Sequence, residues 1–163
     1  MTTQGVRSLS AESLRVVIRR PAEVVALQAR ARAFAAAAGI ANVGCWELAI
    51  AVSEAATNMI KYGGGGIVTL RTSDTPRPHV ALEASDRGAG IEQLEQALVD
   101  NISEGSDARE STTPGRRRGL GLGLGAIYRL MDEVEITSET GQGTTLRARK
   151  WIAADNSCRP TKP

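Results

Sequence analysis

Aromatic side chains are scarce in this sequence: two Trp, two Tyr and one Phe make up 3% of 163 residues. With so few rings, the stacking surface typical of single-stranded nucleic-acid binding is not expected. An excess of one charge is also lacking, because 20 basic side chains oppose 18 acidic ones. Domains that bind nucleic acid usually carry a stronger basic excess. The composition therefore predicts no nucleic-acid partner.

Cysteine and histidine are nearly absent as well. Cys45 and Cys158 are too few for a disulfide framework and suit a reducing cytoplasm. His79 is the only histidine, so neither a histidine-ligated metal centre nor a Ser-His-Asp triad is expected. The first residues contain no apolar signal region, and no apolar run approaches the ~20 residues that a membrane helix requires. We expect a cytoplasmic protein without a membrane segment.

Hydrophobic residues, at 42%, are sufficient for one core, and the chain length suits one domain. We expect this domain to span residues 13–152, between a flexible N-terminus (1–12) and a flexible tail (153–163). Apolar periodicity predicts helices over 21–38, 42–61 and 91–99 and another after Gly125, and strands over 14–19, 67–72, 79–85, 133–138 and 144–151. Residues 100–118 are polar and are expected to form a long mobile loop.

The order of these elements predicts a layered α/β fold, more narrowly an α+β two-layer sandwich. Strands 67–72 and 79–85 are joined by a short turn, as are strands 133–138 and 144–151. Because such hairpins pair strands in opposite directions, we expect a mixed, largely antiparallel sheet. Helices would cover one face of it.

Helix 42–61 has a polar stripe opposite its apolar face. Glu54 and Asn58 lie one turn apart on this stripe, since helical residues four apart point the same way. An amide oxygen can ligate Mg²⁺, which prefers oxygen ligands, and a carboxylate can accept a proton from a hydroxyl group. The pair suits a site for phosphate and metal. The alternative is an ordinary solvated helix face.

Asp86, Gly88 and Gly90 form an Asp-x-Gly-x-Gly turn directly after strand 79–85. Glycine lets the backbone approach a planar ligand closely or adopt positive φ. An aspartate held in this turn can accept a hydrogen bond from an exocyclic amine such as adenine N6. The alternative is a glycine-rich connecting turn.

Glycine and leucine alternate from residue 119 to residue 125, before a predicted helix. Free backbone N–H groups at a helix N-terminus bind anions, and the helix dipole favours phosphate there. A flexible linker is the alternative, but linkers rarely alternate glycine with leucine. No Walker A motif or protein-kinase motif set is present, and the one dinucleotide-type glycine pattern follows a loop rather than a strand.

These segments, in this order, resemble the gyrase, heat-shock chaperone, histidine-kinase and mismatch-repair (GHKL) ATPases, whose nucleotide site is the Bergerat fold. Residues 47–62, 83–91 and 119–125 look like the three boxes of that superfamily, and the Gly-Gln-Gly-Thr-Thr of 141–145 looks like its closing motif. The glycine–leucine run followed by Arg-Leu-Met-Asp-Glu at 129–133 is similar to the small bacterial anti-sigma-factor and stressosome switch-type serine/threonine kinases. The match covers about residues 45–151.

The resemblance implies a role for each matching residue. Asn58 would hold Mg²⁺, Glu54 would be the catalytic base, and Asp86 would bind adenine N6. Thr144 would support Asp86 near the adenine, directly or through water. The remaining residues expected to bind ATP or ADP are Lys61, Gly88, Gly90, Ile91, Gly119, Leu120, Gly121, Leu122 and Gly123. Arg87 departs from the family, which usually has asparagine there, and a side chain of this length can change the rim of the adenine pocket.

The resemblance also implies partners. It indicates a kinase that phosphorylates serine or threonine on a STAS-domain antagonist or scaffold protein in a bacterial partner-switching pathway. The alternative is a non-catalytic switch, in which nucleotide shapes a surface that sequesters a sigma factor or activates a PP2C-type phosphatase. A homodimer is compatible with either. The basic run Arg116, Arg117 and Arg118 suits phosphate, an acidic partner or a solvated lid surface alike.

Overall fold

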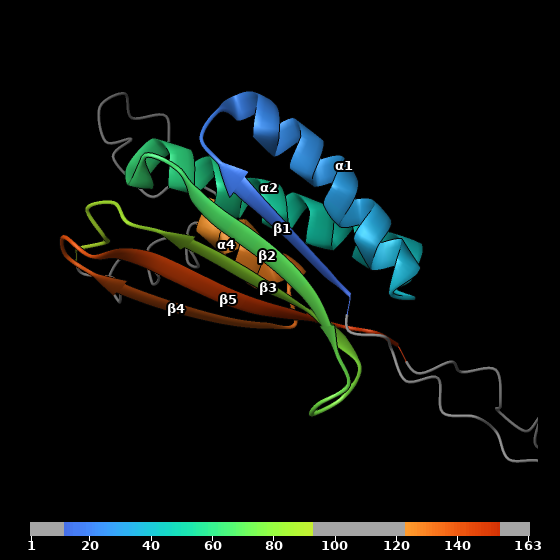
Figure 1. Ribbon diagram of the computed structural model, residues 1–163. Coiled ribbons are helices and arrows are strands. Elements are labelled where there is room, and N and C mark those ends of the chain that lie inside the picture. Colours follow the sequence, from blue (N-terminus) through green and yellow to red (C-terminus); the bar gives the residue numbers. More distant parts are fainter. Residues whose placement is uncertain (1–11, 93–122, 154–163) are drawn as a thin grey trace, which may run out of the picture.

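The computed structural model describes residues 12–92 and 123–153 (Figure 1). The elements follow in the order β1 (Ser13–Ile18), α1 (Pro21–Ala37), α2 (Asn42–Gly63), β2 (Gly66–Ser73), β3 (His79–Asp86), α4 (Gly123–Leu130), β4 (Glu133–Glu139) and β5 (Gly143–Trp151). The five strands and the two long helices fall close to their predicted positions. Ile91 and Glu92 are not helical. The rest of the predicted helix 91–99 and the loop 100–118 lie outside the described residues.

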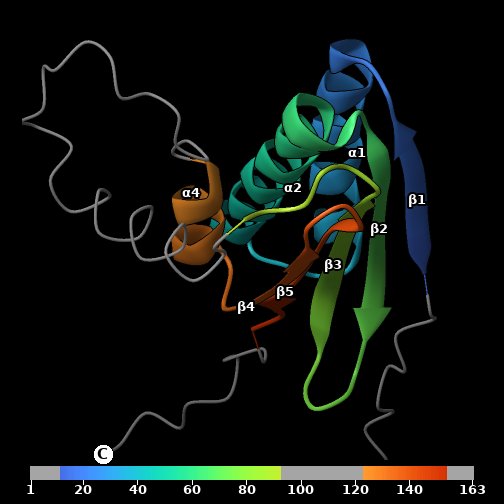
Figure 2. The same ribbon diagram turned by 90° about the vertical axis from the view of Figure 1, so that its left-hand side faces the viewer.

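The five strands form one sheet in the order β1-β2-β3-β5-β4. All four strand pairings are antiparallel. Helices α1, α2 and α4 lie on the same face of this sheet, as the two views show (Figures 1 and 2). The predicted two-layer fold, with a largely antiparallel sheet and helices on one face, is confirmed. The predicted mixed character is not seen among the described strands, because none of them pairs in parallel.

The core lies between the helices and the sheet and follows the alternation of the strands. Val68 and Leu70 of β2, and Val80 and Leu82 of β3, are buried, whereas the residues between them face the other side of the sheet. Leu48 of α2 is completely buried against this face. Each such side chain contributes about 1.5–3 kcal/mol to stability when it leaves water.

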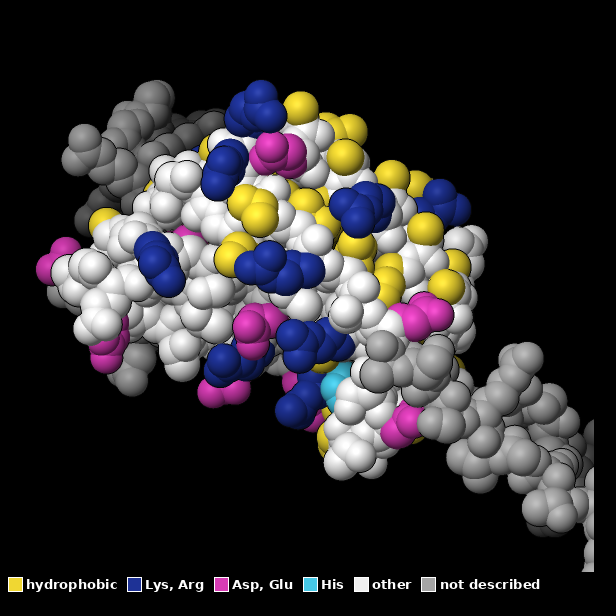
Figure 3. Space-filling model, in the orientation of Figure 1, with side chains coloured by type: hydrophobic (Ala, Val, Ile, Leu, Met, Phe, Trp, Pro, Cys, Tyr) yellow, Lys and Arg dark blue, Asp and Glu magenta, His cyan; other side chains and the backbone are white. Residues whose placement is uncertain are grey.

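The opposite face of the sheet carries charged side chains. Arg147 pairs with Glu83 at 3.0 Å, and Arg149 pairs with Glu133 at 2.5 Å, each across neighbouring strands. In the space-filling view, acidic and basic side chains lie next to one another over the strands (Figure 3). Exposed pairs of this kind contribute little to stability, about 0–1 kcal/mol each.

Proline and a carboxylate define the start of α1. Pro21 occupies the first helical position, where its missing N–H removes no helical hydrogen bond. The backbone N–H groups of Arg19 and Arg20 donate to the Glu23 carboxylate. These two bonds, the Arg19 bond most, hold the pKa of Glu23 below its usual value. The charge also suits the positive end of the helix dipole.

Lys150 of β5 joins three elements on the helix side of the sheet. Its side chain is 12% exposed, and its Nζ lies 2.6 Å from Glu47 Oε2 of α2 and 3.7 Å from Asp132 Oδ1. It also donates to the Leu130 carbonyl at the end of α4, at 2.7 Å. A cation is favourable at a helix C-terminus because the free carbonyls are partly negative there. Lys150 therefore fixes one end of α4 against α2 and β5.

We expect Lys150→Met to lower the free energy of unfolding by about 2–3 kcal/mol, because two partly buried carboxylates and a carbonyl lose their cation. Urea denaturation measures this change. The control is Arg147→Met on the same strand, whose pair with Glu83 is more than half exposed on both sides. It is expected to cost less than about 1 kcal/mol. Equal losses in the two variants would contradict the anchoring role of Lys150.

Candidate nucleotide site

A cavity of about 210 Å³ lies between α2 and the sheet, at the end where β3 leaves the sheet. Its wall combines segments that are far apart in the sequence. It is lined by Ala55, Asn58, Met59 and Tyr62 of α2, by Ala84 and Asp86 of β3, by Gly90, Ile91 and Glu92 of the following turn, by Leu124 of α4, and by Ile136, Thr144 and Leu146 of β4 and β5. Most of these side chains are apolar, and a few polar groups converge among them, as expected of a small-molecule site.

Asp86 lines this cavity with a carboxylate fixed by backbone donors. Its Oδ1 accepts hydrogen bonds from the N–H of Gly88 at 2.9 Å and from the N–H of Thr144 at 3.3 Å. Within residues 12–92 and 123–153, Oδ2 has no hydrogen-bond partner. An ionised carboxylate only accepts hydrogen bonds, so Oδ2 is available to a donor on a ligand. Thr144 supports Asp86 directly through its backbone N–H.

The turn after Asp86 packs tightly on the end of α2. A Cβ added to Gly63 would lie 2.5 Å from Asp86 Cγ, and one added to Gly88 would collide with the backbone of Tyr62 and Gly63. Only hydrogen fits at both positions, so the two glycines let the turn and the helix meet. This close approach brings Asp86 into the wall of the cavity that Asn58 also lines.

Ser138 joins the same turn to the β4–β5 hairpin. Its Oγ accepts the N–H of Ile91 at 2.8 Å and lies 2.8 Å from Thr144 Oγ1. It also donates to the Gly143 carbonyl, at 3.1 Å. Ser138 was not among the residues predicted for the site. The available signal was its place in the alternation of β4, where Val134 and Ile136 face the core and a serine follows on the same side.

The side chains of Glu54 and Asn58 lie close to the start of α4. A Cβ added to Gly123 would lie 2.8 Å from Glu54 Oε2 and 3.2 Å from Asn58 Nδ2. The predicted start of this helix, after Gly125, was too late, because the helix already includes Gly123 and Gly125. Glycine is a poor helix former, so propensity favours a later start. The observed start instead follows the tight packing against α2.

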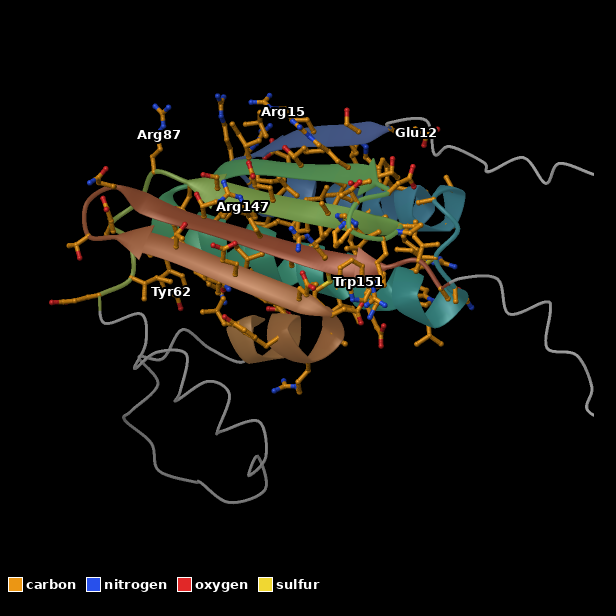
Figure 4. All side chains as sticks on the ribbon, turned by 90° about the horizontal axis from the view of Figure 1, so that it is seen from below. Glu12, Arg15, Tyr62, Arg87, Arg147 and Trp151 are labelled. Carbon is orange, nitrogen blue, oxygen red and sulfur yellow. The ribbon has the colours of Figure 1, made fainter. Side chains whose placement is uncertain are left out.

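Some of the other predicted site residues line the cavity, and others do not. Gly90 and Ile91 line the cavity, whereas Lys61 is exposed and is not part of its wall. Tyr62, which was not predicted as a site residue, lines the cavity and is 48% exposed. Arg87, where the sequence departs from the family, points away from the molecule (Figure 4) and is not part of the cavity wall. Gly119, Leu120, Gly121 and Leu122 lie outside the described residues.

We expect Gly123→Ala to separate stability from nucleotide binding. Gly123 is the first residue of α4, where the preference for alanine seen in helix interiors counts little, and the neighbouring side-chain ends can shift, so the unfolding free energy should change by less than about 1 kcal/mol. The methyl group would nevertheless fill the space between α4, Glu54 and Asn58. Calorimetry should show weaker ATP binding than in the wild type. Unchanged affinity would mean that this space does not receive the nucleotide.

Comparison with known proteins identifies the family. Residues 17–150 match the model of the histidine kinase-like ATPase domain. The serine/threonine-protein kinase RsbT of Bacillus subtilis (strain 168) is 31% identical over 131 residues, which cover 80% of this chain and 90% of that protein. An anti-sigma F factor of Thermoanaerobacter sp. (strain X514) is 32% identical over 112 residues, covering 67% and 71% of the two chains. The chain belongs to the histidine kinase-like ATPase family.

A solved histidine kinase domain, from the blue-light activated histidine kinase EL346 of Erythrobacter litoralis, is also similar to the chain. It aligns with a TM-score of 0.48 at 15% identity, over 90% of this chain and 71% of that one. None of the helices in the described part of the chain combines the length and apolar character needed to cross a membrane.

Proposed function

We propose that the protein is an ATP-dependent serine/threonine kinase whose catalytic domain spans residues 13–152. The observation that carries the proposal is the convergence of three distant segments. Asp86 presents a carboxylate oxygen to the same cavity that Asn58 lines, and Glu54 lies one helical turn from Asn58. Gly123, at the start of α4, lies so near both α2 side chains that an added Cβ would approach each of them within 3.4 Å. This arrangement suits a nucleotide held by its base at one point and by its phosphates at another.

In this proposal, different residues bind the base, the phosphates and the metal ion and accept the proton. Asp86 Oδ2 accepts a hydrogen bond from adenine N6, and the apolar wall of the cavity covers the ring. The N-terminus of α4 favours phosphate because its free N–H groups and the helix dipole are positive. Asn58 would hold Mg²⁺ through its amide oxygen, and the ion would neutralise phosphate charge during transfer. Glu54 takes the proton from the attacking hydroxyl group.

The proposed substrate is a STAS-domain antagonist or scaffold protein in a cytoplasmic partner-switching pathway. The choice of a STAS-domain protein follows from the resemblance to the switch-type kinases. The names of the relatives, one a serine/threonine kinase and the others anti-sigma factors, support a kinase that acts in sigma-factor control. The test is incubation with labelled Mg-ATP and purified candidate STAS-domain proteins, followed by mapping of the phosphorylated residue. We expect phosphoserine or phosphothreonine on one of them. No phosphate on any candidate, with ATP bound and the protein folded, would count against catalysis.

A second candidate is a nucleotide-dependent binding switch. The similarity to anti-sigma F factors favours it, because a factor of that name acts on a sigma factor. In this role nucleotide sets the shape of a surface that sequesters a sigma factor or activates a PP2C-type phosphatase. Both candidates need the same ATP site, and they differ in whether Glu54 is required.

A further inference from the structure

The hydroxyl group of Ser138 makes three hydrogen bonds, which together saturate it. A serine hydroxyl has one hydrogen to donate and two lone pairs that accept. The Gly143 carbonyl can only accept, so the single Ser138 hydrogen is directed to it. The Ile91 N–H takes one lone pair of Ser138 Oγ. The contact with Thr144 Oγ1, at 2.8 Å, must then use the second lone pair.

This assignment fixes the direction of the Thr144 hydroxyl. Since Ser138 has no hydrogen left to give, Thr144 donates its own hydrogen to Ser138. The alternative direction would make one hydrogen bond fewer, because Ser138 would have to release the Gly143 carbonyl. Thr144 lines the cavity, and its oxygen can therefore offer only lone pairs to a ligand there. Asp86, in the same wall, is also an acceptor.

We propose that Ser138 is a positioning residue that determines base selectivity, because it makes Thr144 an obligate hydrogen-bond acceptor beside Asp86. The inference rests on the proposed function, since it assumes that the base lies in this cavity. Two acceptors suit the 6-amino group of adenine, which has two hydrogens to donate. Hypoxanthine has a carbonyl oxygen at the same position, which would face acceptors alone. Buried polar groups left without a partner discriminate strongly between such analogues.

The test compares the binding of ADP and inosine diphosphate in magnesium buffer by calorimetry. The wild type should prefer ADP. In Ser138→Ala, the Thr144 hydrogen is released and can turn to the 6-carbonyl group of inosine diphosphate. The selectivity ratio, which is the Kd of inosine diphosphate divided by the Kd of ADP, should therefore fall about threefold to tenfold. Ser138→Thr retains the hydroxyl and should keep the wild-type ratio. A change in this ratio distinguishes positioning from general loosening, which would weaken both nucleotides alike.

Ser85→Ala is a matched control. Ser85 Oγ lies 3.0 Å from Thr145 Oγ1, so it forms a hydroxyl pair of the same kind one residue along β5. This pair points to the opposite face of the sheet and is not part of the cavity wall. We expect the ratio of ADP to inosine diphosphate affinity in Ser85→Ala to equal that of the wild type.

Several outcomes would overturn the inference. These are a wild type without preference for ADP, an unchanged ratio in Ser138→Ala, or an equal change in Ser85→Ala. If Ser138→Ala does not fold, Thr144→Val provides the same readout, because it removes the acceptor oxygen and should also lower the ratio. An unchanged ratio in that variant overturns the inference. A wild type that binds neither nucleotide rejects the proposed function itself, whereas ADP binding with unchanged selectivity in the variants rejects only the role of Ser138.

Discussion

Replacing Asp86 by asparagine is expected to weaken ADP binding about tenfold to 100-fold, the loss that follows from removing a hydrogen bond to a charged group. The carboxylate accepts the N–H groups of Gly88 and Thr144 on one oxygen, and its other oxygen is the proposed acceptor for adenine N6. An asparagine side chain has only one acceptor oxygen. Either the backbone donors or the adenine amine must then face an NH₂ group. Calorimetry with ADP in magnesium buffer measures the effect.

Glu83→Gln is the control for this variant. Glu83 lies three residues earlier on β3, faces the opposite side of the sheet and pairs with Arg147. Glu83→Gln changes the net charge by the same amount as Asp86→Asn, but it does not alter the cavity wall. We expect its affinity for ADP to match the wild type. If both variants lose affinity equally, net charge and not the Asp86 carboxylate controls binding.

Glu54→Gln is expected to reduce the rate of phosphoryl transfer by about 10²–10⁴-fold, which is the usual contribution of a general base. ATP affinity should remain nearly unchanged, because Glu54 is not part of the wall of the cavity proposed to hold the base. Single-turnover transfer to a STAS-domain substrate measures the first effect, and calorimetry measures the second. A parallel loss of both would show that Glu54 acts in nucleotide binding and not in proton transfer.

Glu47→Gln provides the comparison on the same helix. Glu47 lies seven residues before Glu54 and pairs with Lys150, so its loss should lower stability and leave transfer unaffected. A Glu54→Ala strain then separates the two candidate functions. If signalling in cells survives that substitution, binding of a partner is the main output of the protein and catalysis is secondary.

The sequence predicted those parts of the fold that depend on local periodicity. Alternation of Val80, Leu82 and Ala84 predicted a half-buried strand, and these residues are buried in β3. The spacing of Glu54 and Asn58 predicted one face of one helix, and both lie in α2. Such features follow from the geometry of single elements, because helices repeat every 3.6 residues and strands every two.

Features that depend on the register between elements could not be predicted in this way. Ser138 contacts Thr144 because β4 and β5 pair Ser138 with Thr144 across the hairpin, and it contacts Ile91 because the turn folds back over that hairpin. The early start of α4 at Gly123 is a tertiary effect of the same kind, since packing against Glu54 prevails over helix propensity. The antiparallel pairing of the described strands likewise depends on how the helices return the chain to the sheet.

The most direct test of the account is a ¹H–¹⁵N spectrum of the backbone amides, recorded during titration with ADP in magnesium buffer. One nucleotide held between α2, the turn after β3 and the β4–β5 hairpin should shift the amides of Asn58, Gly88, Ile91 and Thr144 together, along one saturation curve. The amides of Arg147 and Arg149 should move far less. No shifts at saturating ADP, or shifts confined to the charged face of the sheet, would contradict the account.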